Sequence, residues 1–195
     1  MEYPIVEVFR SIQGEGYHTG TPCVFVRLAG CPLHCPFCDT DKKIRYSWSP
    51  TVLVKKIREF WAPVPLIVVT GGEPTQYSLF ELSYELKSAF ECSIHIETNG
   101  FNMEEVKSFD WVSLSPKRSL LLAPETVADE VKWLVPEWSL NDIQRMWELA
   151  PFHFVQPVNY RTKINRDNLK LCLQMMEEEP RLRLSLQLHK VIGVR

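Results

Sequence analysis

Eight apolar segments alternate with helical segments along this chain, and no other feature restricts its fold as strongly. Each of the eight has the length and the β-branched or aromatic content of a buried strand. They lie at residues 5–10, 23–28, 66–70, 93–98, 111–115, 131–135, 152–156 and 184–188. Strands that alternate with helices form βα units, which place neighbouring strands parallel in one sheet.

The helical segments are marked by capping residues and by apolar positions three or four residues apart. They lie at residues 49–61, 77–90, 139–150 and 165–179. Ser49 and Ser139 are candidate N-caps, and Pro50 fits the first position of a helix that begins after Ser49. Apolar stripes such as Leu82 and Leu86 predict packing against a core.

The length of the chain decides between a complete barrel and a partial one. A complete eight-fold (β/α) barrel needs about 250 residues, and this chain has 195. We therefore predict an α/β fold, an abridged and open (β/α) barrel of mostly parallel strands, with its site at the C-terminal ends of the strands. Internal repeats, low-complexity segments and linkers are absent from the sequence, so residues 1–195 are predicted to form a single domain.

Composition excludes several classes of function. The formal charge is −2 and the isoelectric point is about 6.2, which argues against a nucleic-acid partner. Apolar runs stay shorter than the roughly 20 residues that span a bilayer, and the first residues lack the apolar core of a signal peptide. We expect a cytoplasmic protein without a membrane partner. There, cysteines act as thiols or metal ligands, and Cys23, Cys92 and Cys172 lie in apolar surroundings typical of core thiols.

Three further cysteines, Cys31, Cys35 and Cys38, lie within eight residues of each other. Clustered thiolates in a reducing compartment select soft metals such as zinc or an iron–sulfur cluster. His34 could complete a Cys₃His zinc site, although structural zinc ligands usually come as separated pairs. A [4Fe–4S] cube held by three cysteines of one loop fits the spacing better, and it would leave one iron without a protein ligand. The zinc site remains the alternative.

Polar residues follow several of the predicted strands. The strand at 66–70 ends in the sequence Gly-Gly-Glu-Pro (71–74), where adjacent glycines allow a ligand to approach the backbone closely. An ordinary tight turn is the alternative for these glycines. Polar stretches also follow other strands, at 97–100, 115–117 and 156–159. Loops at the C-terminal ends of parallel strands carry the site in barrels of this kind.

The spacing Cys-x-x-x-Cys-x-x-Cys, with Phe37 before the last cysteine, resembles the signature of the radical S-adenosylmethionine superfamily. The Gly-Gly-Glu sequence at 71–73 resembles the motif whose backbone meets the methionine amino group in that superfamily, with Glu73 supporting the turn. The resemblance implies that the unligated iron chelates S-adenosylmethionine. An electron from the cluster then releases methionine and a 5′-deoxyadenosyl radical.

A series of further motifs narrows the resemblance. In order, "SIQGEG", "RxxGC", "CDT", "TGGEP", "ETNG", "SPK", "VQP" and "LQLHK" resemble the 7-carboxy-7-deazaguanine synthase family from about residue 5 to about residue 190. Members of that family convert 6-carboxy-5,6,7,8-tetrahydropterin to 7-carboxy-7-deazaguanine, on the route to queuosine and related deazapurines. The reaction contracts a ring and releases ammonia, so the resemblance implies a lyase that uses a [4Fe–4S] cluster, S-adenosylmethionine and Mg²⁺.

The resemblance also assigns roles to residues of this chain. The cluster ligands are Cys31, Cys35 and Cys38. The S-adenosylmethionine contacts are Phe37, Cys38, Asp39, Gly72, Ser115, Pro116, Lys117, Gln156, Pro157, Val158 and Asn159. The pterin contacts are Ile12, Gln13, Gly14, Glu15, Arg27, Thr70, His189 and Arg195. Arg27 would bind the pterin carboxylate, Glu15 the amino-pyrimidine edge, and Thr40 would offer its hydroxyl to Mg²⁺. No residue is assigned as a catalytic acid or base.

Some of these assignments have their own alternatives. Asn159 stands where the family commonly has an acid, and Arg195 would have to close the site with its terminal carboxylate beside its own positive charge. Thr40 could be a loop cap, Arg27 a solvent-facing strand residue, Glu15 a solvated loop acid and His189, expected on the last strand, a histidine beside the core. The radical is expected to remove hydrogen from C6 of the pterin.

The remaining expectations concern the partners of the protein and the alternative functions that share its cysteine motif. We expect a small pterin substrate, an unidentified electron donor and a homodimer formed through exposed sheet edges. A glycyl-radical activating enzyme shares the cysteine spacing, but it gives no reason for "SIQGEG" or for Arg27. A zinc-binding interaction module is the non-enzymatic alternative.

Overall fold

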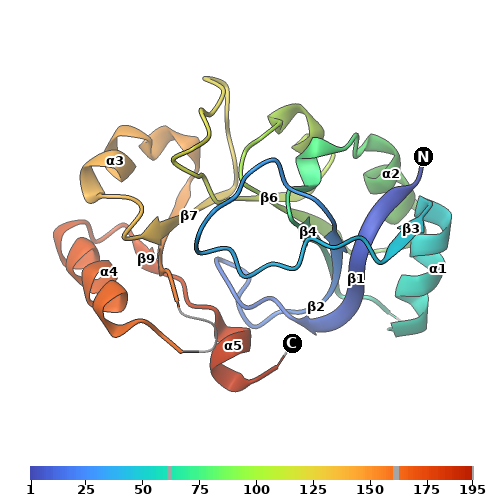
Figure 1. The fold of residues 1–195 in the computed structure, drawn as a ribbon, viewed down its shortest axis with the longest axis horizontal. Helices are drawn as coiled ribbons and strands as arrows, with labels where there is room; N and C mark the ends of the chain where they lie inside the picture. The colour runs from blue at the N-terminus through green and yellow to red at the C-terminus, as the bar shows by residue number, and fades with distance from the viewer. Residues whose placement is uncertain (61–62, 160–162, 195) are drawn as a thin grey trace.

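The strands form one sheet in the order β3-β1-β2-β4-β5-β6-β7-β8-β9 (Figure 1). The computed structural model describes residues 1–60, 63–159 and 163–194. Within these residues the strands are β1 (Tyr3–Ile12), β2 (Pro22–Leu28), β3 (Tyr46–Trp48), β4 (Leu66–Gly71), β5 (Ser93–Thr98), β6 (Trp111–Leu114), β7 (Glu130–Val135), β8 (Phe152–Pro157) and β9 (Arg183–Leu184). From β2 to β9 every pairing is parallel, and β1 is antiparallel to β2 and β3.

The sheet curves into a partial barrel with β3 and β9 at its two edges, which do not pair with each other in the described residues. This confirms the predicted α/β fold, an abridged and open barrel of mostly parallel strands. The helices are α1 (Pro50–Phe60), α2 (Phe80–Ala89), α3 (Leu140–Arg145), α4 (Arg166–Glu178) and α5 (Leu188–Ile192), with short 3₁₀ helices η1 (Pro74–Gln76), η2 (Met103–Val106) and η3 (Trp147–Leu149). Helices α1 to α4 lie outside the curved sheet (Figure 1).

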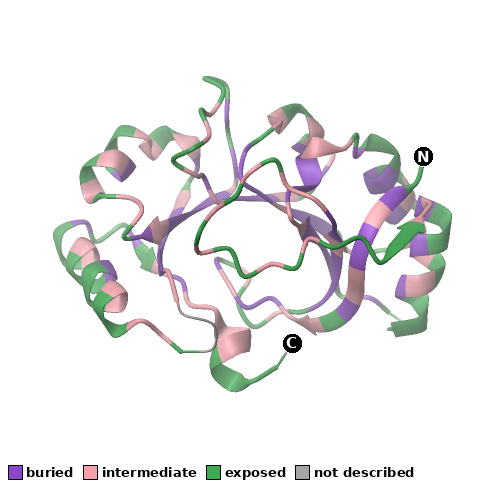
Figure 2. Ribbon diagram, in the orientation of Figure 1, coloured by how far each residue is buried: buried purple, intermediate pink, exposed green. Residues whose placement is uncertain are grey.

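Alternation along each strand separates two kinds of side chain. In β5 and β7 the residues Ile94, Ile96, Val131 and Trp133 belong to the main core between the sheet and the helices. Their neighbours in the sequence point into the barrel because successive side chains of a strand face opposite sides. The strands are largely buried, as Figure 2 shows in purple. The inward positions are therefore free to carry the polar groups described below.

The four predicted helices overlap α1 to α4, and their caps explain where two of them begin. Ser139 forms a capping box with Asp142 at the start of α3, which satisfies two of the backbone donors at this end of the helix. The Ser49 hydroxyl accepts the N–H of Val52 at the start of α1. None of the helices among the described residues has the length and apolar character to cross a membrane.

The expected strand at 184–188 is wrong beyond Leu184. Polar side chains inside this segment find partners within the barrel, which bends the chain inward. The Ser185 hydroxyl donates to Gln156 at 2.7 Å, and the Gln187 amide donates to Glu15 at 3.0 Å. The chain then continues as α5, so His189 lies on a helix and not on the last strand. Strand β3 was not expected, because only three residues form it at the edge.

Two loops close the barrel at opposite ends. The loop between β1 and β2 lies at the N-terminal end, where Tyr17 and His18 pack against Trp111 at ring-centroid distances of 5.2 and 4.6 Å. The loop between β2 and β3, which carries the three clustered cysteines, crosses in front of the space that the sheet encloses (Figure 1). The C-terminal residues of the parallel strands lie at the space between these two loops.

Candidate functional site

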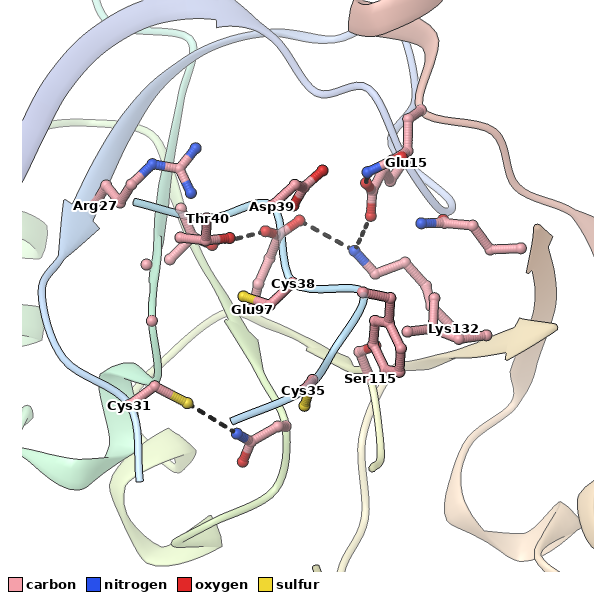
Figure 3. A pocket seen from close by; sticks show the side chains of 18 of the residues that line it. Glu15, Arg27, Cys31, Cys35, Cys38, Asp39, Thr40, Glu97, Ser115 and Lys132 are labelled. Carbon is pink, nitrogen blue, oxygen red and sulfur yellow. Dashed lines mark hydrogen bonds and ion pairs between the residues drawn. The ribbon is translucent and has the colours of Figure 1, made fainter. Parts of the chain in front are cut away.

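A cavity of about 470 Å³ opens at the C-terminal ends of the strands and extends toward the loop between β1 and β2. Almost all the site residues predicted from the sequence line it. Gly14 and Pro116 do not, and Arg195 lies outside the described residues. Figure 3 shows Cys31 and Cys35 in the lower part of the view and Arg27 and Glu15 in its upper part, with Cys38 near the centre and Lys132 reaching in from the right.

The cysteine loop presents all three of its thiols to the cavity. Cys31 and Cys35 are half-buried and Cys38 is exposed. Burial raises the pKa of the Cys35 thiol, with Lys117 acting in the opposite direction. The Lys42 ammonium holds the loop by donating to the carbonyl oxygen of Leu33 at 2.9 Å. Three soft ligands on one wall of a cavity are the donor set that an iron–sulfur cluster uses.

The zinc alternative is not supported by this geometry. Among the described residues, no three histidine, cysteine or acidic side chains converge as ligands of a single metal ion would. His34 is exposed on the loop and does not line the cavity. A closed tetrahedral site needs four converging ligands, whereas a cube spreads its ligands over separate irons.

The turn after β4 fits tightly against the chain that leaves β2. Gly71 has φ of 143°, which L side chains rarely adopt. A Cβ at Gly72 would lie 1.7 Å from the carbonyl oxygen of Gly30, so only glycine permits this approach. The Gly72 N–H donates to Leu28 at 3.0 Å. The N–H of Gly72 is therefore already engaged within the protein, and the turn is held against the chain that leaves β2.

Glu73 supports this turn from inside. Its carboxylate is buried and accepts hydrogen bonds from the N–H and the hydroxyl of Thr75 at 3.0 and 2.7 Å, the hydroxyl of Thr98 at 2.6 Å and the N–H of Asn99 at 2.7 Å. One side chain thus ties the turn after β4 to the end of β5. Glu73 holds the shape of the cradle, and its oxygens are already occupied.

Asn99 supplies an observation that points to a ligand at this wall. Its amide nitrogen lies 3.9 Å from the Cys31 sulfur, and its carbonyl oxygen is buried without a hydrogen-bond partner in the described structure. Buried polar atoms almost always have a partner, so a lone acceptor beside a thiol indicates a missing donor. The residues present here therefore fit a cluster and an amino-group-bearing ligand bound against it.

The ends of β6 and β8 complete this wall. Lys117 donates to the carbonyl and hydroxyl oxygens of Ser115, both at 2.6 Å, and burial lowers the pKa of Lys117 to about 8. Gln156 is buried and accepts from Ser185. Asn159, which stands where an acid was expected, accepts the N–H of Asn165 at 3.0 Å through its side-chain oxygen. This hydrogen bond connects the residue that follows β8 with Asn165, the N-cap of α4.

Two carboxylates and a lysine form a buried charged group in the site. Lys132 donates to Glu15 at 2.8 Å and to Glu97 at 3.2 Å. Burial alone would raise the pKa of Glu15, but the charge of Lys132 outweighs it and lowers this pKa to about 2. Burial alone would lower the pKa of Lys132, and the two carboxylates raise it instead. Glu15 is therefore ionised and Lys132 is charged.

Arg27 lies on β2 beside Glu7 of the antiparallel strand β1, with its Nε donating to the carboxylate at 3.0 Å. The guanidinium also lies 5.8 Å from the centre of the Phe9 ring. Both members of the pair line the cavity. Because Glu7 is engaged through Nε, the terminal nitrogens of Arg27 form the edge that can bind a planar anion.

The segment at 185–192 forms a side wall of the cavity. His189 lines the cavity from α5, and burial lowers its pKa. A Cβ at Gly14 would lie 2.1 Å from the His189 ring, so Gly14 serves the site by making room for this histidine. Lys190 contacts Asp39 of the cysteine loop, which connects α5 with the wall on which the thiols lie.

Several cavity residues received no individual role from the sequence, among them Glu7, Glu97, Asn99, Lys132 and Gln187, although Glu97 and Asn99 lie in the polar stretch noted at 97–100. A signal for three of them was present. Glu7, Glu97 and Lys132 are charged residues inside otherwise apolar strands, at positions that alternate with the core residues. A charge on the buried face of a strand must have a partner. Gln187 carried no such signal, because it lay in a segment expected to be a strand.

Comparisons with known proteins agree with the site. Residues 25–151 match the family model described as the radical SAM superfamily. A protein named 7-carboxy-7-deazaguanine synthase from Bacteroides thetaiotaomicron is 37% identical over 98% of both chains. The protein of that name from Buchnera aphidicola is 34% identical over 100% of both chains. The crystal structure of QueE from Escherichia coli superposes with a TM-score of 0.76, at 29% identity, over 96% of this chain and 95% of that one.

Proposed function

The chain belongs to the radical SAM superfamily and, within it, to the 7-carboxy-7-deazaguanine synthases, and from this premise we propose how its residues divide the work of the reaction. The enzyme is a lyase that converts 6-carboxy-5,6,7,8-tetrahydropterin to 7-carboxy-7-deazaguanine in queuosine biosynthesis. The cluster and S-adenosylmethionine supply a 5′-deoxyadenosyl radical, and the protein binds, orients and excludes water.

One wall of the cavity would hold the cofactors. Cys31, Cys35 and Cys38 bind the [4Fe–4S] cluster in this proposal, and the lone carbonyl oxygen of Asn99 supports a ligand beside Cys31. The contacts to S-adenosylmethionine are Phe37, Cys38, Asp39, Gly72, Ser115, Pro116, Lys117, Gln156, Pro157, Val158 and Asn159. Pro116 does not line the cavity, so its part is to shape the turn between Ser115 and Lys117.

The opposite side of the cavity would bind the pterin. The proposed contacts are Ile12, Gln13, Gly14, Glu15, Arg27, Thr70 and His189, with Arg195 outside the described residues. Arg27 binds the pterin carboxylate through its free edge, since Glu7 already holds its Nε. Glu15 accepts from the amino-pyrimidine edge, and Lys132 keeps that carboxylate ionised. Hydrogen removal from C6 would then take place between the two walls.

Thr40 is the proposed magnesium ligand. It lines the cavity next to Asp39 and Asp41, whose carboxylates contact Lys190 and Arg45. The hydroxyl oxygen of Thr40 is thus the hard ligand that this part of the loop can offer without breaking an ion pair. Mg²⁺ retains several waters and binds substrate oxygens, so one protein oxygen is compatible with its chemistry.

One observation carries the proposal: three thiols, a glycine cradle and a charged recognition group line the same cavity. The direct experiment is anaerobic reconstitution with iron and sulfide, followed by an assay with carboxy-tetrahydropterin. We expect brown iron–sulfur absorbance and formation of 7-carboxy-7-deazaguanine. With substrate deuterated at C6, label should enter 5′-deoxyadenosine or returned S-adenosylmethionine. A colourless zinc protein, or product without label transfer, would contradict the proposal.

The alternatives predict other results. A glycyl-radical activating enzyme would form a radical on a protein partner and leave the pterin unchanged, and the buried charges around Lys132 would have no substrate to recognise. The proposed function also requires an electron donor that reduces the cluster. We also propose one domain over residues 1–195, a cytoplasmic location and a homodimer. Sedimentation of the reconstituted enzyme tests the dimer.

A further inference from the structure

Lys132 lies deep in the cavity with only 5% of its side chain exposed. It is the third residue of β7, and its neighbours Val131 and Trp133 face the outer core. Its side chain therefore points into the barrel, as the alternation of a strand requires. A lysine in such a place needs charged partners, because burying an unpaired ammonium group is strongly unfavourable.

Its partners come from two separate parts of the chain. Glu97 lies on β5, and β6 lies between β5 and β7 in the sheet, so the two backbones are about 10 Å apart. Glu15 lies in the loop between β1 and β2, which covers the N-terminal end of the barrel. The Lys132 ammonium bridges these elements, with distances of 2.8 Å to Glu15 and 3.2 Å to Glu97.

Uncharged donors fix the remaining carboxylate oxygens. The second oxygen of Glu15 accepts from Gln187 at 3.0 Å. Glu97 accepts from the Gln13 amide at 3.1 Å and from the Thr70 hydroxyl at 2.8 Å. Each carboxylate oxygen thus has a donor from the protein, which fixes both groups in position. Carboxylate oxygens have about four lone-pair sites between them, so further donors from a ligand can still be accepted.

The charge of the group suits a ligand that presents N–H groups. The two carboxylates exceed the one ammonium in this group of three side chains, which leaves the group itself with an excess of acceptors. A tetrahydropterin has N–H donors on both rings: N3–H and the 2-amino group on the pyrimidine, and N5–H and N8–H on the reduced ring. A bicycle with donors on several edges is held in one orientation by more than one fixed acceptor, and Glu15 alone provides only one carboxylate.

We infer that Lys132 is a positioning residue, which holds Glu15 and Glu97 at a fixed spacing so that both carboxylates accept N–H groups of the bound pterin. The inference rests on the proposed function and extends it to two residues, Lys132 and Glu97, that carry no role in the motifs. Lys132 acts through the two carboxylates, while S-adenosylmethionine on the opposite wall is independent of it.

The test measures two affinities in the same protein. In reconstituted enzyme without reductant, which prevents turnover, the dissociation constants of carboxy-tetrahydropterin and of S-adenosylmethionine are determined by anaerobic calorimetry. In Lys132→Met the pterin affinity should fall about ten- to a hundredfold, as weakened hydrogen bonds to charged groups predict. S-adenosylmethionine affinity and cluster absorbance should not change. Lys132→Arg should restore part of the pterin affinity, because it returns the charge.

Two further variants keep the result decisive. Lys87→Met removes an exposed lysine paired with Asp110 on the outside of the barrel, and it should change neither affinity. If Lys132→Met folds poorly, the double variant Lys132→Met/Glu97→Gln removes one charge of each sign, so that it folds and still binds the pterin weakly. Wild-type pterin affinity in folded Lys132→Met, or in the folded double variant, would overturn the inference. An equal loss of affinity for the pterin and for S-adenosylmethionine would also overturn it, because this is the result expected if Lys132 only stabilises the fold.

Failure of the proposed function would be seen separately. A wild-type enzyme that binds S-adenosylmethionine but shows no affinity for carboxy-tetrahydropterin would refute the assigned substrate, and with it the role of Lys132. A wild-type enzyme that binds both, with Lys132→Met equal to it, refutes only the positioning role.

Discussion

Gly72 lies where the turn after β4 meets the chain that leaves β2, and this contact decides the shape of the cofactor wall. The atom that would face a new side chain is a backbone carbonyl oxygen, which cannot rotate away as a flexible side chain can. Any residue larger than glycine must therefore move the backbone. The movement would displace either the turn or the segment that leads directly into Cys31.

We predict that Gly72→Ala weakens S-adenosylmethionine binding by at least about tenfold, because a backbone shift of even 1 Å disrupts a preorganised site. Equilibrium binding to the reconstituted protein is the measurement. Gly20→Ala is the matched control, since nothing lies within 4 Å of a Cβ there and only its positive φ is strained. Equal affinities in the two variants would argue against a ligand at the Gly72 turn.

Arg27 illustrates a second constraint at the level of single residues, the planar geometry of its side chain. Glu7 occupies Nε and Phe9 lies beside the guanidinium, so the orientation of its free edge is set before a ligand arrives. Lysine has the same charge but cannot present two parallel N–H groups to a carboxylate. A lysine at position 27 therefore keeps the positive charge but removes the planar pair of N–H groups, so the two contributions to binding can be measured apart.

Arg27→Lys is expected to raise the KM for carboxy-tetrahydropterin about tenfold, the loss associated with one charge-assisted hydrogen bond, while S-adenosylmethionine binding is retained. Steady-state kinetics at saturating S-adenosylmethionine provide the measurement. Arg58→Lys, on the outer face of α1, is the control and should match the wild type. A KM that does not change in Arg27→Lys would place the pterin carboxylate elsewhere.

Among the elements, the loop between β1 and β2 packs against the N-terminal end of the barrel and also reaches into the cavity. In the middle of the loop, Tyr17 and His18 pack against Trp111 at the N-terminal end of the barrel. The first residues of the loop, Gln13 and Glu15, extend from there into the cavity. The position of Glu15 therefore depends on packing at the opposite end of the barrel from the cysteines.

His95 makes this packing sensitive to pH. Burial, and then the nearby His18, lower the pKa of His95 to about 4. The unfolded chain takes up this proton near pH 6.5, so it binds more protons than the folded protein between pH 6.5 and 4. Stability from this group is present above pH 6.5 and is lost as the pH falls toward 4. The loss is up to about 3 kcal/mol, at about 1.4 kcal/mol per pKa unit.

Denaturant unfolding of the metal-free protein between pH 7 and pH 4 measures this effect. His153 and His189 also have lowered pKa values and add to the slope, so the comparison is made with His95→Gln. The free energy of unfolding should depend less on pH in this variant than in the wild type. His34→Gln, at an exposed position, should retain the wild-type dependence. Identical slopes for His95→Gln and the wild type would refute the assignment.

For the whole molecule, the alternation of apolar strands and helices predicted the parallel sheet, because each buried strand shows its own local pattern, and the length of the chain predicted that the barrel is open. The same holds for the cysteine loop and the glycine turn, whose residues are contiguous. The Lys132 group could not be predicted in this way. Glu15 and Lys132 are 117 residues apart, and only the curvature of the open sheet brings them together. The turn after Leu184 likewise depends on partners inside the barrel.

The central claim concerns the whole cavity: a cluster held by three cysteines keeps one iron free for S-adenosylmethionine, opposite a charged pterin site. Electron–nuclear double resonance of the reduced, reconstituted enzyme with S-adenosylmethionine labelled at its amino nitrogen and carboxylate oxygens tests it most directly. The account predicts hyperfine coupling of both labels to the cluster. A cluster without such coupling, with a fourth protein ligand in its place, would contradict it.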